Sequence, residues 1–323
     1  MRRDRTTCTP EQACANRLGF AFCALLAAML AVQYAATAMI SHIAPALAET
    51  DGYLWLLSLL PIYGVGLPIC LLLLRRCPSQ PPAAHQMPMR RWWLAFLLSM
   101  GLMYFGNLIG SMLMLFVSAL RGLPPVNPIQ AIILEQNPLW TALATVVAAP
   151  LGEEFIFRRL IIDRTRRYGE LPAVLLSAAM FGAFHLNFYQ FFYAFLIGLV
   201  LGYVYVKTGR LRYTIALHAA INFLGGVVAP ALLRAIQPML ELLQSGEIDG
   251  LADLLAVLNL PALSAYFAYA ALGVACAGAT LVIAIVAHRR LRFSPGTGGR
   301  ALRRSPAILA FFALCAVMAV ISM

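Results

Sequence analysis

Long apolar runs constrain this chain more than any other feature of its sequence. A segment that crosses the hydrocarbon of a bilayer needs about 20 mostly apolar residues in a helix, because its backbone groups must pair with one another there. The sequence therefore predicts an all-α, polytopic transmembrane helical bundle of eight to nine spans, with eight if the last run is peripheral. The runs are Leu18–Ile40, Tyr53–Leu74, Trp92–Leu120, Pro138–Ile162, Leu171–Asn187, Phe191–Val206, Tyr213–Leu233, Leu263–Ala287 and Pro306–Met323.

Composition and charge distribution agree with membrane insertion. Hydrophobic residues make up 62% of the chain and charged residues 11%, and the mean hydropathy is +0.81, outside the usual range of soluble proteins. The net charge of +11 lies in alternate loops, whereas Ser41–Gly52 has no Lys or Arg and Arg234–Pro261 is net acidic. The positive-inside rule therefore predicts a cytoplasmic N-terminus and an exterior C-terminus in the plasma (inner) membrane. Since the basic residues mark topology, we expect no nucleic-acid partner.

The runs and loops predict five parts. Residues 1–17 form a cytoplasmic tail, 18–137 the N-terminal spans, 138–230 a membrane core, 231–261 an exterior amphipathic segment and 262–323 the C-terminal spans. The first run could be a cleaved signal peptide, but its length and the charge alternation favour an uncleaved anchor. The seven cysteines show neither a disulfide framework nor a CxxC metal pattern.

Two adjacent carboxylates, Glu153 and Glu154, interrupt the fourth run. Charge at membrane depth is costly, so such residues usually face a protein-lined or wet cavity and pair with another group. Arg158 follows Glu154 by four residues and lies on the same helix face, whereas Glu153 has no local counter-charge. Pro150 cannot donate to the carbonyl of Val146 and should kink the helix just before the acids. On this segment alone, two acids that merely pair with the arginines of a helix end are an equally good interpretation.

Histidines in two further runs favour a functional site. His185 lies in the fifth run, and His218 and Asn222 share one face of the seventh. If Gly169 marks the turn between the fourth and fifth helices, Glu153 lies as many residues before it as His185 lies after it, which predicts equal depth in an antiparallel pair. A lone intramembrane histidine is more often an interhelical hydrogen bond. Two histidines, an amide and two acids on three runs predict a common site.

Three motifs in this order resemble the signatures of the CPBP family, which includes CAAX prenyl protease 2, lysostaphin-resistance-protein-A-like and bacteriocin-processing proteins. They are Glu153-Glu154-x-x-x-Arg158, Phe181-x-x-x-His185 and His218-x-x-x-Asn222, within roughly Pro138–Phe223. The resemblance implies an intramembrane endopeptidase that cleaves a membrane-associated peptide or protein. Its implied catalytic set is Glu153, Glu154, Arg158, His185, His218 and Asn222.

The resemblance also implies a role for each residue of this set. Glu153 with His185 would position and deprotonate a water molecule for attack on a peptide carbonyl. His218 and Asn222 would donate hydrogen bonds to the resulting oxyanion, and Arg158 would orient the acidic pair. A carboxylate in an apolar site suits a general base, and preset donors stabilise an oxyanion, so the chemistry agrees independently.

Several alternatives stay open at the level of sequence. Family members are often called metalloproteases, and Glu153, His185 and His218 are a plausible zinc set, yet no HExxH helix is present and a metal-free glutamate mechanism is slightly preferred. A non-proteolytic immunity or scaffold member would keep the same fold. A proton-coupled transporter could also use intramembrane Glu and His, but the sequence lacks the internal symmetry typical of transporters.

Overall fold

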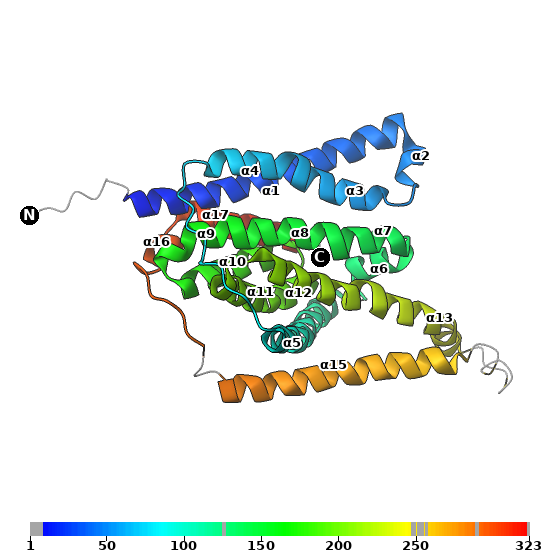
Figure 1. Cartoon of the computed structure of the whole chain (residues 1–323). Helices are drawn as coiled ribbons and strands as arrows, with labels where there is room; N and C mark the ends of the chain where they lie inside the picture. Colours follow the sequence, from blue (N-terminus) through cyan, green and yellow to red (C-terminus); the bar gives the residue numbers. More distant parts are fainter. Residues whose placement is uncertain are drawn as a thin grey trace, which may run out of the picture.

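The computed structural model of the protein describes residues 9–124, 127–246, 250, 255, 258–287 and 291–321. Within these ranges every regular element is a helix, and seven helical stretches are long and apolar enough to cross a membrane (Figure 1). The predicted all-α polytopic bundle is therefore confirmed. The seven stretches are Pro10–Ile43, Tyr53–Leu74, Met89–Arg121, Pro138–Tyr168, Phe188–Thr208, Leu211–Ser245 and Leu260–Val286.

An N-terminal group of helices forms one side of the bundle. Helix α1 (Pro10–Ile43) is followed by the short α2 (Pro45–Ala48) and by a stretch made of α3 (Tyr53–Leu60), the π-helical η1 (Pro61–Gly66) and α4 (Leu67–Leu74), which lies beside α1 (Figure 1). Thr9 accepts a hydrogen bond from the backbone of Gln12, so α1 begins before the apolar run predicted from Leu18. The C-terminal α17 (Pro306–Ile321) packs against α1.

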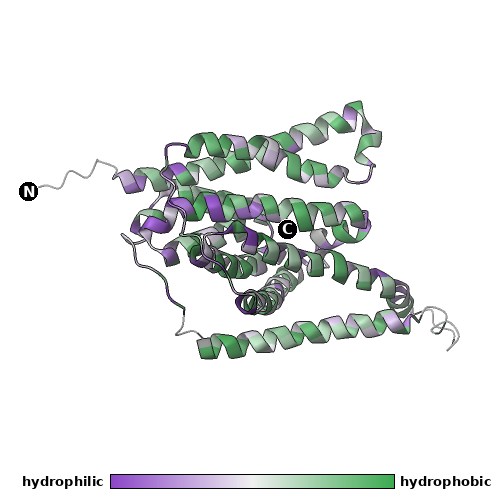
Figure 2. Cartoon of the chain, in the orientation of Figure 1, coloured by the Kyte–Doolittle hydropathy of each residue, from purple (hydrophilic) through white to green (hydrophobic). Residues whose placement is uncertain are grey.

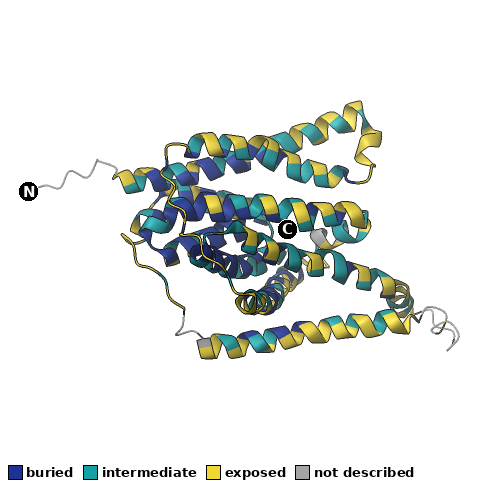
Figure 3. Cartoon of the chain, viewed as in Figure 1, coloured by how far each residue is buried: buried dark blue, intermediate teal, exposed yellow. Residues whose placement is uncertain are grey.

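Small residues on α5 (Met89–Arg121) allow close packing on both of its sides. A Cβ at Gly106 would lie 2.3 Å from the backbone of Tyr193 in α11 (Phe188–Thr208), and one at Gly101 would lie 2.5 Å from the carbonyl of Cys276 in α15 (Leu260–Ala287). Contacts of this kind bring helix backbones together where apolar burial alone cannot drive association in lipid. Figure 2 shows that hydrophobic residues cover most of α15, and Figure 3 shows that many of them are exposed at the surface where lipid would lie.

The fourth predicted span is one continuous helical stretch with changing winding. It consists of α7 (Pro138–Ala142), the π-helical η2 (Leu143–Ala148), α8 (Ala149–Glu153), the π-helical η3 (Glu154–Ile162), α9 (Asp163–Thr165) and the 3₁₀ turn η4 (Arg166–Tyr168). Gly169, with φ of 120°, makes the predicted turn into α10 (Glu170–Phe184).

The helices that follow complete the bundle. The sixth stretch, Leu211–Ser245, comprises α12 (Leu211–Phe223), the π-helical η5 (Leu224–Val228) and α13 (Ala229–Ser245). In α13, Arg234 donates hydrogen bonds to the carbonyls of Ile133 and Leu134 in α6 (Pro128–Glu135), so this arginine caps the end of α6. The short α16 (Arg300–Arg303) precedes α17.

Two predicted spans are shorter in the structure. Helix α10 has 15 residues and α17 has 16, which correspond to roughly 22–24 Å and fall short of the ~30 Å hydrocarbon core. Helix α10 ends because Leu186 adopts a left-handed conformation (φ 55°) and Asn187 caps α11. The stretch Leu211–Ser245 also continues without a break past residue 230, after which an exterior segment was predicted. Most of residues 247–257 lie outside the described residues.

Candidate active site

The predicted site residues come from the helices at the centre of the bundle. Glu153 ends α8 and Glu154 begins η3, at the point where the backbone changes from α-helical to π-helical winding. Helix α12, which carries His218 and Asn222, packs against α8, η2 and η3, and α10 packs against η3. Figure 3 shows that the most buried part of the molecule lies around these helices. The acids therefore sit at a junction of three helices.

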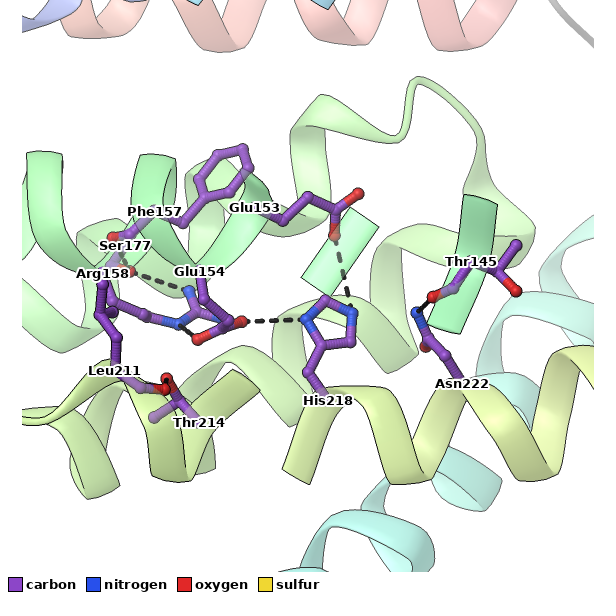
Figure 4. Close-up of polar contacts among 10 residues, drawn as sticks. All are labelled: Thr145, Glu153, Glu154, Phe157, Arg158, Ser177, Leu211, Thr214, His218 and Asn222. Carbon is purple, nitrogen blue, oxygen red and sulfur yellow. Dashed lines mark hydrogen bonds and ion pairs between the residues drawn. The ribbon is translucent and has the colours of Figure 1, made fainter. Parts of the chain in front are cut away.

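His218 lies between the two glutamates. Its Nδ1 is 3.0 Å from Oε1 of Glu154, and its Nε2 is 3.6 Å from Oε2 of Glu153 (Figure 4). The first distance is a hydrogen bond, in which the nitrogen donates because a carboxylate can only accept. The second is longer than a hydrogen bond, so Nε2 is not committed to Glu153. His218 thus supplies the counterpart for Glu153 that no sequence neighbour provides.

Glu154 and Arg158 form the ion pair predicted from their spacing. The Nε and Nη2 atoms of Arg158 donate to the two carboxylate oxygens of Glu154 at 3.0 and 3.3 Å, and both side chains are 0% exposed. Arg158 also donates to Oγ of Ser177 at 3.0 Å, and Ser177 donates to the carbonyl of Phe157 at 2.7 Å. The guanidinium lies 4.8 Å from the ring centre of Phe181. This network fixes Glu154 in place beneath His218.

Glu153 has a more open environment than its neighbour. Its side chain is 24% exposed, and Nε2 of His218 lies 3.6 Å from its carboxylate. A general base must reach water and substrate, whereas a fully paired, fully buried carboxylate cannot. The two adjacent acids are therefore not equivalent.

His185 contacts Phe181, whose aromatic ring also contacts His218. Its Nδ1 is 2.9 Å from the carbonyl of Phe181, which can only accept, so Nδ1 carries a proton, and in the neutral ring Nε2 has the lone pair. The ring of Phe181 packs edge-on against His185 at 5.1 Å and against His218 at 5.6 Å. The histidine that lies against Glu153 is His218, whereas the sequence interpretation paired Glu153 with His185.

Asn222 binds a backbone carbonyl that Pro150 leaves without a donor. In the π-helical η2, the N–H of Ala149 bonds the carbonyl of Ala144, five residues earlier. The next donor in this register would be residue 150, but proline has no N–H, so the carbonyl of Thr145 is left over. Nδ2 of Asn222 donates to it at 2.7 Å. In the α-helical register expected from the sequence, Pro150 would instead leave the carbonyl of Val146 without a donor.

Three further residues support the site and were not identified from the sequence. Ser177 and Thr145 have the roles given above, and Tyr63 of η1 packs against Gly152, which directly precedes Glu153. A Cβ at Gly152 would lie 2.1 Å from Cε1 of Tyr63. Gly152 directly precedes the acidic pair in the sequence, but no sequence pattern indicates which distant helix packs against it.

The donor set does not fit a zinc centre formed by Glu153, His185 and His218. Nδ1 of His218 is bonded to Glu154, and its Nε2 faces Glu153. Across the described part of the chain, no group of three or more His, Cys, Asp or Glu side chains is arranged to hold a metal ion. These residues are therefore given no role as metal ligands.

The fold and the site together define an integral membrane protein of helical type with a Glu–His–Glu–Arg network between its central helices. Residues 135–224 match the family model described as type II CAAX prenyl endopeptidase Rce1-like. The matched region contains all six predicted site residues and agrees with the resemblance over Pro138–Phe223. Over this region the chain is similar to the type II CAAX prenyl endopeptidases that the model describes. No curated protein and no solved structure gives a match.

Proposed function

We propose that the protein is an intramembrane endopeptidase that hydrolyses a peptide bond in a membrane-associated peptide or protein. The observation that carries this proposal is the difference between the two adjacent acids. Glu154 is fully buried and tied to Arg158 and His218, whereas Glu153 is part-exposed and held only loosely by His218. Of the two, Glu153 alone combines access to water with a nearby histidine.

The proposed reaction begins with a water molecule between Glu153 and His185. Glu153 accepts a proton from this water, and the lone pair on Nε2 of His185 accepts its other hydrogen bond. The water oxygen forms a bond to the carbonyl carbon, and the carbonyl π electrons move to its oxygen. The proton held by Glu153 then passes to the amide nitrogen, the C–N bond breaks, and a carboxyl and an amine leave.

Two groups can stabilise the negatively charged oxygen of the intermediate. Asn222 uses one of its N–H groups for the carbonyl of Thr145 and can offer the second to the oxyanion. His218 can donate through Nε2 when that atom is protonated, because Nδ1 alone is committed to Glu154. Arg158 touches no reacting atom in this scheme and acts as a positioning residue through Glu154. Preset donors of this kind contribute most where charge develops.

The orientation proposed for the protein follows its loop charges. The N-terminus, the loop after α4 and the arginine-rich stretch from 159 to 167 would face the cytoplasm, and the loop before α3 would face the exterior of the plasma (inner) membrane. The domain divisions given above stay a proposal as well, with residues 138–230 as the catalytic core.

Paired glutamine variants test the function. Membrane peptides from cells that express the wild type or Glu153→Gln are compared, and a peptide cleaved only by the wild type becomes the reporter for purified protein in liposomes. Glu153→Gln should lose at least ~100-fold in kcat with little change in melting temperature. Glu154→Gln should instead lower the melting temperature strongly, because Arg158 is left buried without its counter-charge, at a cost of about 3–5 kcal/mol.

If Glu153→Gln cleaves the reporter at near-normal rates, Glu153 is not the general base. If the two peptide populations do not differ, the protein is a proteolytically silent member of its family.

A further inference from the structure

A pair of buried thiols connects two distant parts of the chain at one end of the bundle. Sγ of Cys14 in the second turn of α1 lies 2.8 Å from Sγ of Cys77, which follows α4. Both residues are buried, with 8% and 4% exposure. The thiol of Cys77 also lies 3.6 Å from the carbonyl of Cys14, and its backbone N–H bonds the carbonyl of Leu74. The two sulfurs are thus held together by fixed backbone on both sides.

Positively charged side chains near the cysteine pair favour formation of a thiolate. Three guanidinium groups, of Arg17, Arg164 and Arg167, act electrostatically on Cys14. The Nε atoms of Arg164 and Arg167 are buried without a hydrogen-bond partner, and within the described structure neither arginine forms an ion pair. Positive charge of this kind stabilises a thiolate, which is the form that attacks an oxidant.

We propose that Cys14 and Cys77 are an oxidation site that closes reversibly into a disulfide. A disulfide needs its sulfurs at about 2.05 Å, so the observed pair has to close by only roughly 0.8 Å. No other pair of described cysteines has its sulfurs in contact. The pairing joins α1 to the segment after α4, and both residues belong to the hydrophobic cluster that contains Phe157 beside the Glu154–Arg158 pair.

The oxidant in this proposal is a peroxide. The thiolate of Cys14 attacks one peroxide oxygen, the O–O bond breaks, and Cys14 becomes a sulfenic acid while the other oxygen leaves as water after protonation. The sulfur of Cys77 then attacks the sulfenic sulfur, the S–O bond breaks, and a second water leaves as the S–S bond forms. Two thiols lose two electrons in total, and one peroxide is reduced to two waters. A dithiol reductant reverses the change.

Peptide mapping of the folded protein tests this inference. The purified full chain in liposomes, with Cys8→Ser to remove the thiol nearest in sequence, is treated with hydrogen peroxide, alkylated, digested and analysed by mass spectrometry. A linked peptide containing Cys14 and Cys77 should form and should disappear on treatment with dithiothreitol. Cys14→Ser and Cys77→Ser should abolish it. Cys70→Ser is the matched control, since Cys70 is also buried in α4 but is not in contact with another described cysteine, and it should leave the link intact.

A second measurement does not require replacement of Cys14 or Cys77. Peroxide should raise the melting temperature of the Cys8→Ser protein, because the link constrains an unfolded chain over a separation of 63 residues. Sulfinic or sulfonic acids at either cysteine without a linked peptide would overturn the inference. So would a link that forms only after the protein is unfolded.

Discussion

Glu153 and Glu154 are adjacent in one helical stretch but have different surroundings, because successive side chains on a helix point in directions about 100° apart. Glu154 therefore faces the interface with α10 and α12, where it binds Arg158 and His218 and where Ser177 holds Arg158. Glu153 faces a less enclosed region. A buried carboxylate is tolerated only with such partners. The arrangement separates one acid that orients the histidine from another that remains free to react.

We expect activity to survive prolonged treatment with strong chelators. Among the described residues no three His, Cys, Asp or Glu side chains are arranged to hold a metal ion, and Nδ1 of His218 is bonded to Glu154. Reporter cleavage and bound zinc are measured on the same purified protein before and after chelation. Zinc that is stoichiometric, lost with activity and restored with it would make Glu153 a ligand and shift the role of base towards Glu154.

Asn222→Ala should lower both stability and kcat. The melting temperature should fall because the carbonyl of Thr145 loses its donor, a loss of roughly 0.6–2 kcal/mol for an interhelical hydrogen bond. If Asn222 also binds the oxyanion, kcat should fall by about 10²–10³ with little change in KM.

A second variant separates these two effects. Pro150→Ala restores an N–H in the register that reaches Thr145, so Pro150→Ala combined with Asn222→Ala should recover stability while kcat stays low. Melting temperature and active-site-normalised kcat are compared across the single and double variants. Recovery of kcat together with stability would leave Asn222 as a structural residue.

At the scale of elements, the change in winding around α8 positions the acids. The five residues of α8 lie between two π-helical segments, η2 and η3, and the missing N–H of Pro150 falls where the first of these ends. Segments of this kind re-aim side chains relative to a regular helix. The N-terminal group of helices supports this region from the other side, since Tyr63 of η1 fills the space over Gly152.

Gly152→Ala should therefore impair the protein more than an alanine elsewhere in a helix. Its Cβ would overlap the ring of Tyr63, so either η1 or the backbone beside Glu153 must move. We expect a lower melting temperature and at least a ~10-fold loss of kcat, since small displacements of a reacting group are costly. Gly278→Ala in α15 is the matched control, because nothing lies within 4 Å of the added carbon. Equal behaviour of the two variants would show that Tyr63 does not hold the site helix.

At the scale of the whole molecule, close turns fix the ends of the central helices. The turn at Gly169 lies against Gly296, and the segment after α15 continues along it, where the N–H of Thr297 bonds the carbonyl of Arg167 and that of Gly298 bonds Tyr168. Lys207 of α11 and Ser294 both bind the carboxylate of Glu170. The basic end of the bundle is thereby tied together by residues far apart in sequence (Figure 2).

The proposed orientation predicts the side from which engineered cysteines react. Arg76→Cys, after α4, should be labelled from the cytoplasm by a membrane-impermeant maleimide, and Glu49→Cys, before α3, from the exterior. Both positions are exposed, and the 22-residue stretch Tyr53–Leu74 separates them. The unmodified chain, whose described cysteines are buried or half-buried, gives the background. The reverse pattern would show that the topology is inverted. Labelling of both engineered cysteines from the same side would show that Tyr53–Leu74 does not cross the membrane.

The sequence by itself determined the fold class, the family motifs and the pair of Glu154 with Arg158. Long apolar runs admit little except helices in a bilayer, and a spacing of four residues places two side chains on one helix face whatever surrounds them. Only the tertiary structure decided that His218 rather than His185 lies against Glu153, that Asn222 binds Thr145 and that Tyr63 covers Gly152. These contacts join helices far apart in the chain and depend on their packing and on the π-helical register beside Pro150, which no local spacing of residues specifies.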